Sequence, residues 1–143
     1  MADVFISYSR RNGERAAAIS DGLEGCGHSV WWDRRLSSGA DYGSVIEREI
    51  DAAGCVVVAW SADARESLWV RAEANEALDA GKLVQVTLDR AKLPLPFTIL
   101  HFLDFSRWPG GREAPPWSEL EGRVGAVLRG ESGQEALQRH LPE

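Results

Sequence analysis

The chain has 143 residues and a formal net charge of −6, which is the size of one domain with a buried core. An acidic chain without a basic stripe excludes a nucleic-acid partner. No segment approaches the roughly 20 consecutive apolar residues that cross a bilayer, and the first residues lack the basic region and cleavage site of an export signal. The sequence therefore predicts a cytoplasmic protein without a membrane partner.

The two cysteines do not form a disulfide framework. Cys26 and Cys55 are far apart, and no Cys/His spacing suggests zinc. We expect both to be small buried hydrophobic residues in a reducing compartment. The sequence predicts no bound metal and no cofactor.

Strand-like and helix-like segments alternate along the chain. In chain order the sequence predicts a strand at 3–7, a polar loop at 8–12, a helix at 13–25, a strand at 28–32, a long loop at 33–43, a helix from the cap Asp41 to Gly54, a strand at 55–60, one helical stretch at 61–80, a strand at 83–88, a short edge strand at 101–105 and an amphipathic helix at 117–128. The apolar run CVVVAW at 55–60 is typical of a central strand buried on both faces.

This alternation predicts an α/β fold of the flavodoxin-like type. We expect a doubly wound, five-stranded parallel sheet with strand order 2-1-3-4-5 and helices on both faces. Residues 1–130 would form the domain, and residues 131–143 a polar tail or the start of a linker.

Ligands of doubly wound sheets bind outside the carboxyl ends of the strands, where the strand order reverses. Here that point lies between the first and third strands, and the loop at 33–43 is able to fold over it. The rule selects Tyr8, Ser9, Arg10, Arg11, Trp60 and Ser61. Paired arginines there, and Arg34 with Arg35 in the loop, suit an anion such as a pyrophosphate, although exposed loop charges remain the commoner reading.

Trp69 and Glu73 are four residues apart, which places them on one face of a helix with Ser67 at its entrance. An indole beside a carboxylate suits a sugar, and a carboxylate near an anomeric carbon stabilises an oxocarbenium-like transition state. The alternatives are open: Glu73 with Glu76 and Asp79 reads as a solvated polar face, Trp69 as a packing anchor, and Ser67 as a helix cap.

Other catalytic motifs are absent from the sequence. The glycines of residues 22–27 end a helix, so they fail the dinucleotide-binding fingerprint. No phosphate-binding loop and no nucleophile elbow occur. Response-regulator receivers need an acidic pair after the first strand, where this chain has Ser9, Arg10 and Arg11.

Five segments, in order and spacing, resemble the Toll/interleukin-1 receptor (TIR) domain family. They are DVFISYS at Asp3–Ser9, WWD at Trp31–Asp33 followed by Leu36 and Gly39 of the loop called BB, CVVVAWS at Cys55–Ser61, SLWVRAE at Ser67–Glu73, which matches S-x-W-x-x-x-E, and GKLVQV at Gly81–Val86. The resemblance covers roughly residues 2 to 130.

The family contains adaptor-type domains and domains that cleave NAD+, and a glutamate at the position of Glu73 chiefly separates them. The resemblance implies a bacterial-type NAD+ nucleosidase that releases nicotinamide and ADP-ribose or a cyclic product, with NAD+ as substrate. Glu73, ionised at neutral pH, would be the catalytic residue. The substrate-binding residues would be Tyr8, Ser9, Arg10, Arg11, Asp33, Arg35, Leu36, Ser67 and Trp69.

The resemblance also implies partners and a context. Such domains act as defence or signalling effectors in head-to-tail oligomers or filaments with other TIR domains, sometimes with a fused sensor domain. The BB loop gates the site, and Ser38, where many members have proline, predicts a more flexible loop. Two rival functions remain: a non-catalytic interaction module, and an N-glycosidase similar to nucleoside deoxyribosyltransferases, which acts on free nucleosides.

Overall fold

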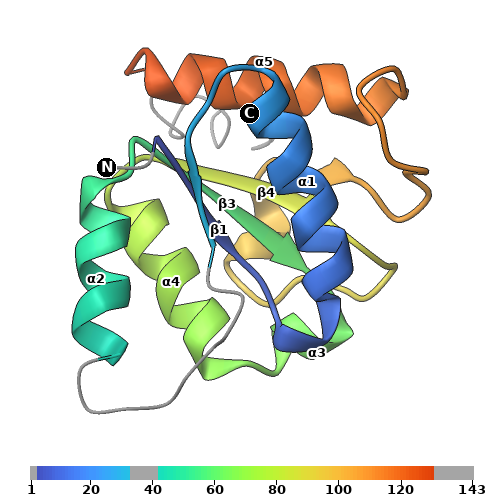
Figure 1. Ribbon diagram of the computed structural model, residues 1–143. Coiled ribbons are helices and arrows are strands. Elements are labelled where there is room, and N and C mark those ends of the chain that lie inside the picture. Colours follow the sequence, from blue (N-terminus) through green and yellow to red (C-terminus); the bar gives the residue numbers. More distant parts are fainter. Residues whose placement is uncertain (1–2, 33–41, 131–143) are drawn as a thin grey trace, which may run out of the picture.

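A computed structural model describes residues 3–32 and 42–130. The strands form a single sheet, and helices connect successive strands along the chain (Figure 1). They are β1 (Val4–Ser7), η1 (Arg10–Asn12), α1 (Gly13–Gly25), β2 (Val30–Trp31), α2 (Tyr42–Ala52), β3 (Cys55–Trp60), α3 (Ala62–Arg65), α4 (Leu68–Asp79), β4 (Leu83–Thr87), η2 (Phe97–Ile99), β5 (Leu103–Asp104) and α5 (Pro115–Leu128).

The predicted sheet is confirmed. Its five strands run in the order β2-β1-β3-β4-β5, and every neighbouring pair is parallel. Strands β1 and β3 lie side by side over four residues, with Ser7 opposite Val58 at the end of β1. The order reverses between these two strands, so the carboxyl ends of β1 and β3 form the switch point of the fold.

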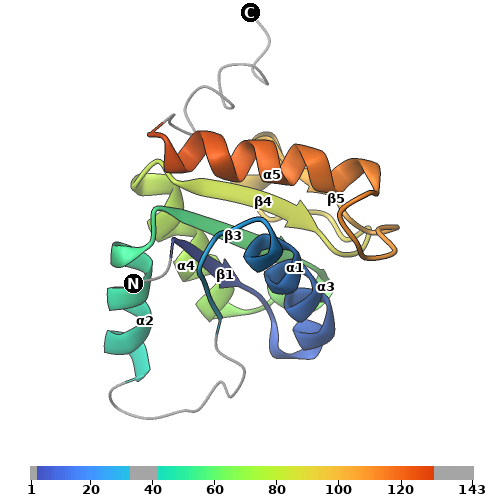
Figure 2. The ribbon, with the colours of Figure 1, turned by 45° about the horizontal axis from the view of Figure 1, so that its top comes forward.

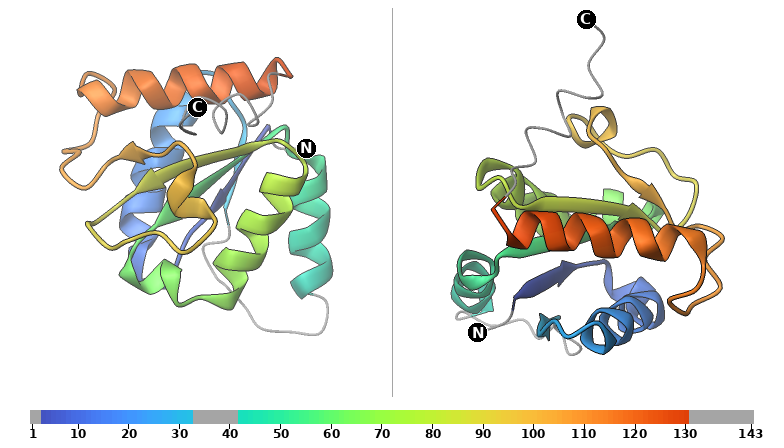
Figure 3. Two further views of the ribbon diagram at one scale, coloured as in Figure 1. Left: turned by 180° about the vertical axis from the view of Figure 1, so that it is seen from behind. Right: turned by 90° about the horizontal axis from the view of Figure 1, so that it is seen from above.

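Helices cover both faces of the sheet, and each face has its own core (Figure 2). Side chains of α1 and α5 pack on one face with alternate residues of β1, among them Val4 and Ile6. Side chains of α2, α3 and α4 pack on the other face with Phe5. Because successive strand residues point to opposite faces, Ser7 lies on the same face of β1 as Phe5. The view from above in Figure 3 shows the sheet between these two layers.

The helical stretch predicted at 61–80 is wrong in one respect: the structure has two helices there. Ser61 caps α3, since its Oγ accepts a hydrogen bond from the backbone N–H of Ala64 at 3.0 Å. Ser67 caps α4 in the same way through the N–H of Val70, at 3.2 Å. Both serines have extended backbone angles. Each of the two serine caps starts a helix, so the helical conformation is interrupted between α3 and α4.

Both edge strands are shorter than predicted. Strand β2 spans only Val30–Trp31 and β5 only Leu103–Asp104, because an edge strand has a neighbour on one side only to define its length. Helix α5 begins at Pro115, ahead of its predicted start at Trp117, since proline fits the first turn of a helix. The predicted cap Asp41 and the predicted tail at 131–143 lie outside the described residues.

The proline-rich connection between β4 and β5 is held by one buried amide. Gln85 of β4 accepts a hydrogen bond from the indole N–H of Trp60 at 2.8 Å. Its own amide group donates to the carbonyls of Phe97 and His101, both at 3.2 Å. The ring of Phe97 packs on that of Trp60, with centroids 5.2 Å apart. These contacts anchor the connection behind the end of β3.

The cysteines largely follow the prediction. Cys55 is fully buried in β3, and burial raises the pKa of its thiol to about 12. Cys26 is half-buried against the core of α1 and α5. Both are free thiols. In the two described ranges, no helix is long and apolar enough to cross a membrane.

Candidate active site

The carboxyl ends of β1 and β3 open onto the beginnings of α1, α3 and α4, which gather along the lower edge of the molecule in Figure 1. The segment after β1 contains η1, and the segment after β3 contains α3. A hydrogen bond joins them: the Ser61 hydroxyl donates to Asn12 Oδ1 at 2.6 Å. Sequence reasoning selected Ser61 but missed Asn12, which has no motif around it.

Glu73 points from the second turn of α4 into the sheet. Its side chain is only 8% exposed, so the prediction that it belongs to a solvated polar face is wrong. Val70, Ala74 and Ala77 of the same helix are also buried. With Glu73 they occupy positions i, i+3, i+4 and i+7, the spacing of a buried helix stripe. Glu73 is thus an acidic residue at a position of α4 where an apolar residue is usual.

A side chain from the sheet hydrogen-bonds to the buried carboxylate. The hydroxyl of Ser7, the last residue of β1, donates a hydrogen bond to Glu73 Oε1 at 2.5 Å. Ser7 is 1% exposed. Sequence reasoning placed Ser7 inside a strand and did not select it. Its signal was present, because a serine in an apolar strand stands out on the face that packs against α4.

Burial changes the protonation of Glu73. It raises the pKa of the Glu73 carboxyl to about 7, and the Ser7 hydrogen bond acts in the opposite direction. Desolvation disfavours the charged form of a carboxyl. The expectation of a carboxylate with an ordinary pKa is therefore wrong, and near neutral pH the protonated and ionised forms of Glu73 coexist.

Ser67 and Trp69 stand at the entrance of α4, as predicted. The Ser67 hydroxyl is the helix cap, which was the structural reading of this residue. Trp69 is 53% exposed, and Leu68 before it is 82% exposed. The indole of Trp69 thus lies at the surface one turn before Glu73, and it does not serve as an anchor in the core.

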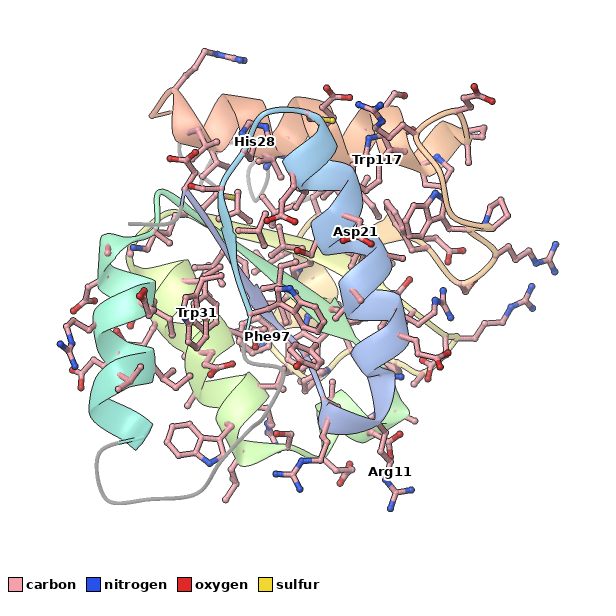
Figure 4. The ribbon with its side chains drawn as sticks, in the orientation of Figure 1. Arg11, Asp21, His28, Trp31, Phe97 and Trp117 are labelled. Carbon is pink, nitrogen blue, oxygen red and sulfur yellow. The ribbon has the colours of Figure 1, made fainter. Side chains whose placement is uncertain are left out.

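The residues after β1 separate into two groups. Tyr8 is 8% exposed and lies in the core between the sheet and helices α1 and α5. Its ring packs edge to face on that of Trp32, with ring centroids 5.6 Å apart. Ser9 is half-buried, and Arg10 and Arg11 present more of their surface. Figure 4 shows the Arg11 side chain extending outward from η1. Of the four residues predicted here, Arg10 and Arg11 are thus exposed to a ligand, Ser9 is partly so, and Tyr8 is not.

The remaining predicted site residues, Asp33, Arg35 and Leu36, lie outside the described residues, as does Ser38. In the part of the chain that is described, no group of three or more His, Cys, Asp or Glu side chains is arranged to hold a metal ion.

This chain is similar to solved structures of TIR domains and of a receptor named TIR-STING. The TIR domain of the Toll-related receptor TRR-2 from Hydra magnipapillata is 16% identical with a TM-score of 0.75, over 87% of this chain and 99% of that one. The TIR-STING receptor from C. gigas in complex with 2′,3′-cGAMP is 22% identical with a TM-score of 0.68, over 90% of this chain and 40% of the receptor. The TIR domains of the activated Roq1 resistosome are 17% identical with a TM-score of 0.53, over 97% and 96%.

These identities establish the fold alone. A search of curated proteins gave no match. The family model described as TIR domain, however, matches residues 4–120, which is most of the chain and includes β1, Trp69 and Glu73. On this match, the chain belongs to the TIR domain family.

Proposed function

We propose that this TIR domain is an NAD+ nucleosidase, which cleaves the bond between nicotinamide and ribose. Water takes the place of nicotinamide at the ribose carbon to give ADP-ribose, or an internal nucleophile of the ADP-ribosyl group does so to give a cyclic form. The observation that carries the proposal is the position of Glu73: a carboxyl group buried at the switch point of the sheet, hydrogen-bonded to the end of β1. Burying an acid costs stability, and acids with a strongly shifted pKa cluster at functional sites.

The proposed reaction needs one main contribution from the protein, a negative charge near the ribose carbon. Nicotinamide leaves a cationic pyridinium as a neutral base, so no general acid is needed. Positive charge develops at the ribose carbon, and an ionised Glu73 facing it would lower the barrier by about 3–4 kcal/mol. Low surrounding polarity strengthens that attraction. The pyridinium charge of bound NAD+ would also favour the ionised form of Glu73, whose pKa is about 7 in the free protein.

Residues near the mouth have roles in this proposal. The exposed Trp69 ring would stack on the nicotinamide or ribose. Arg10 and Arg11 would contact the pyrophosphate, since guanidinium groups bind phosphate oxygens in pairs of hydrogen bonds. Asp33, Arg35 and Leu36 would complete the pocket, and the BB loop would gate it. No metal or cofactor takes part.

A comparison of substrates tests the proposal. The domain is incubated at high concentration, with a chelator present, with NAD+ and separately with nicotinamide riboside and a purine nucleoside. We expect release of nicotinamide from NAD+ and slower cleavage of the compounds without a pyrophosphate. Cleavage of the purine nucleoside in preference to NAD+ would instead support the deoxyribosyltransferase-like alternative.

The second candidate function is a non-catalytic module that binds other TIR domains. The observation that favours it is the exposed apolar pair Leu68 and Trp69 at the start of α4, because apolar side chains at a surface suit protein contacts. The two functions are compatible, since we also propose that a head-to-tail assembly of TIR domains activates the enzyme in defence or signalling. One similar structure, the Roq1 resistosome, is named as an assembly.

Assembly predicts that activity depends on concentration. Specific activity should rise when the protein concentration is raised by about a hundredfold, because neighbouring copies would complete each other's sites. Arg34→Glu and Arg35→Glu should blunt the rise. Turnover measured across the dilution series, beside the oligomeric state by light scattering, gives the result. A flat dilution curve in an active preparation would rule out activation by assembly and leave the role of Glu73 untouched.

A further inference from the structure

Ser7 and Glu73 come from different layers of the fold. Ser7 ends β1 in the middle of the sheet, beside β3, whereas Glu73 comes from the helix layer that covers this face. Their hydrogen bond joins the last position of β1 to the second turn of α4, 66 residues later in the chain. The donor pairs with Val58 of β3 in the parallel ladder, so the sheet holds its backbone in place.

The bond distinguishes the two oxygens of the carboxylate. Oε1 accepts the Ser7 hydroxyl. Within residues 3–32 and 42–130, Oε2 accepts no hydrogen bond from a side chain, and it is not among the fully buried polar atoms that lack a partner, which are in Ser20, Ser106 and Trp117. Of the two carboxylate oxygens, Oε2 is therefore the one that Ser7 leaves for a ligand to approach.

From this geometry we propose that Ser7 is a positioning residue for Glu73: its hydroxyl fixes Oε1 and so presents Oε2 to the substrate. The inference rests on the proposed function for its catalytic meaning, but the orienting contact itself is a property of the free protein. A carboxylate with one oxygen tied to a rigid strand loses less freedom in the transition state than one able to rotate.

The same bond stabilises the ionised form that the chemistry needs. A hydroxyl that donates to a carboxylate favours its charged state. The other charged groups of α4 and of the elements packed against it are exposed or half-buried: Glu47, Arg48, Glu49, Asp51, Asp63, Arg65, Arg71, Glu76 and Asp79. Strands β1, β3 and β4 carry no charged side chain. The titratable group of β3 is Cys55, the first residue of the strand, which precedes Val58, the residue that pairs with Ser7. Burial and Ser7 are the two effects that act on the Glu73 pKa.

Three variants separate positioning from a merely structural role. Ser7→Ala removes the hydroxyl, and Ser7→Thr keeps it on a residue that suits a strand. Ser20→Ala is the matched control: Ser20 is also 1% exposed, but it lies on α1, on the other face of the sheet. Its hydroxyl has no hydrogen-bond partner among the residues that the structure describes. All three changes are small, so circular dichroism should show the native fold in each.

The experiment has two readings on the full chain. The first is titration of the Glu73 carboxyl by carbon NMR without substrate, and the second is the pH dependence of NAD+ cleavage. Ser7→Ala should raise the apparent pKa of Glu73 by about one pH unit, move the acidic limb of the rate profile upward by the same amount, and lower kcat at its plateau about tenfold. Ser7→Thr should restore both readings, and Ser20→Ala should leave them at wild-type values.

An unchanged Glu73 titration in Ser7→Ala would overturn the proposal, as would a Ser7→Thr variant that is as impaired as Ser7→Ala. If the wild-type chain does not cleave NAD+, the proposed function fails but the NMR titration still decides whether Ser7 holds the carboxylate.

Discussion

Glu73→Gln should lower the rate of NAD+ cleavage by about a hundredfold or more while the protein stays folded. Glutamine has nearly the same shape as glutamate, and its amide oxygen still accepts the hydrogen bond that Ser7 donates to Oε1 in the wild type. What it lacks is the negative charge that faces the ribose carbon. Loss of one such preorganised group typically costs two to three powers of ten in kcat.

The control for this variant is Glu76→Gln. Glu76 is on the same helix and undergoes the same chemical change, but it is exposed, so its turnover should remain within about twofold of the wild type. The measurement is nicotinamide release at saturating NAD+ above pH 7. If Glu73→Gln keeps most of its turnover and a native circular dichroism spectrum, the catalytic assignment is wrong.

The same substitution should make the protein more stable above pH 7. The pKa of Glu73 is about 7 in the folded chain against an ordinary value of 4.5, so the folded state binds the proton more tightly than the unfolded state. The free energy of unfolding of the wild type therefore falls as pH rises from about 4.5 to 7. The accumulated loss is about 3 kcal/mol, and the Glu73→Gln variant avoids it because an amide does not ionise.

Urea unfolding of the two proteins at several pH values measures this effect. The difference in free energy of unfolding between Glu73→Gln and wild type should be small near pH 4, grow up to pH 7, and then stay constant. The difference between Glu76→Gln and wild type should show no comparable growth, since Glu76 is exposed. A Glu73→Gln difference that is the same at pH 4 and pH 8 would mean that the carboxyl titrates normally.

The fold followed from the sequence because its signals extend over whole segments. The run at Cys55–Trp60 is apolar at every position, and every one of its residues is buried. Such a strand fits only the middle of a sheet with helices on both faces. The break between α3 and α4 depends on single hydroxyl groups, which have a weaker signature, and the residues flanking Glu66 are compatible with a continuous helix.

The candidate site could be located from the sequence but its interior could not. The switch-point rule and the S-x-W-x-x-x-E pattern both selected the start of α4. Glu73 looked solvent-exposed because Glu76 lies one turn later, whereas its spacing from Val70 and Ala77 placed it on the buried stripe. Its partner Ser7 lies 66 residues away, and a contact of that separation becomes visible only when β1 and α4 are packed together.

Because the helix is interrupted before Ser67, the orientation of α4 does not depend on the length of α3. Each residue added to a continuous helix turns everything after it by about 100°, so in an unbroken helix a change in length near Ala62 would rotate Glu73 away from Ser7. In this chain the Ser67 cap starts α4 anew, and the direction of Glu73 is counted from Ser67. Insertions and deletions around α3 can therefore accumulate in related sequences and reshape the rim of the site, while the acid and its hydroxyl partner keep their alignment.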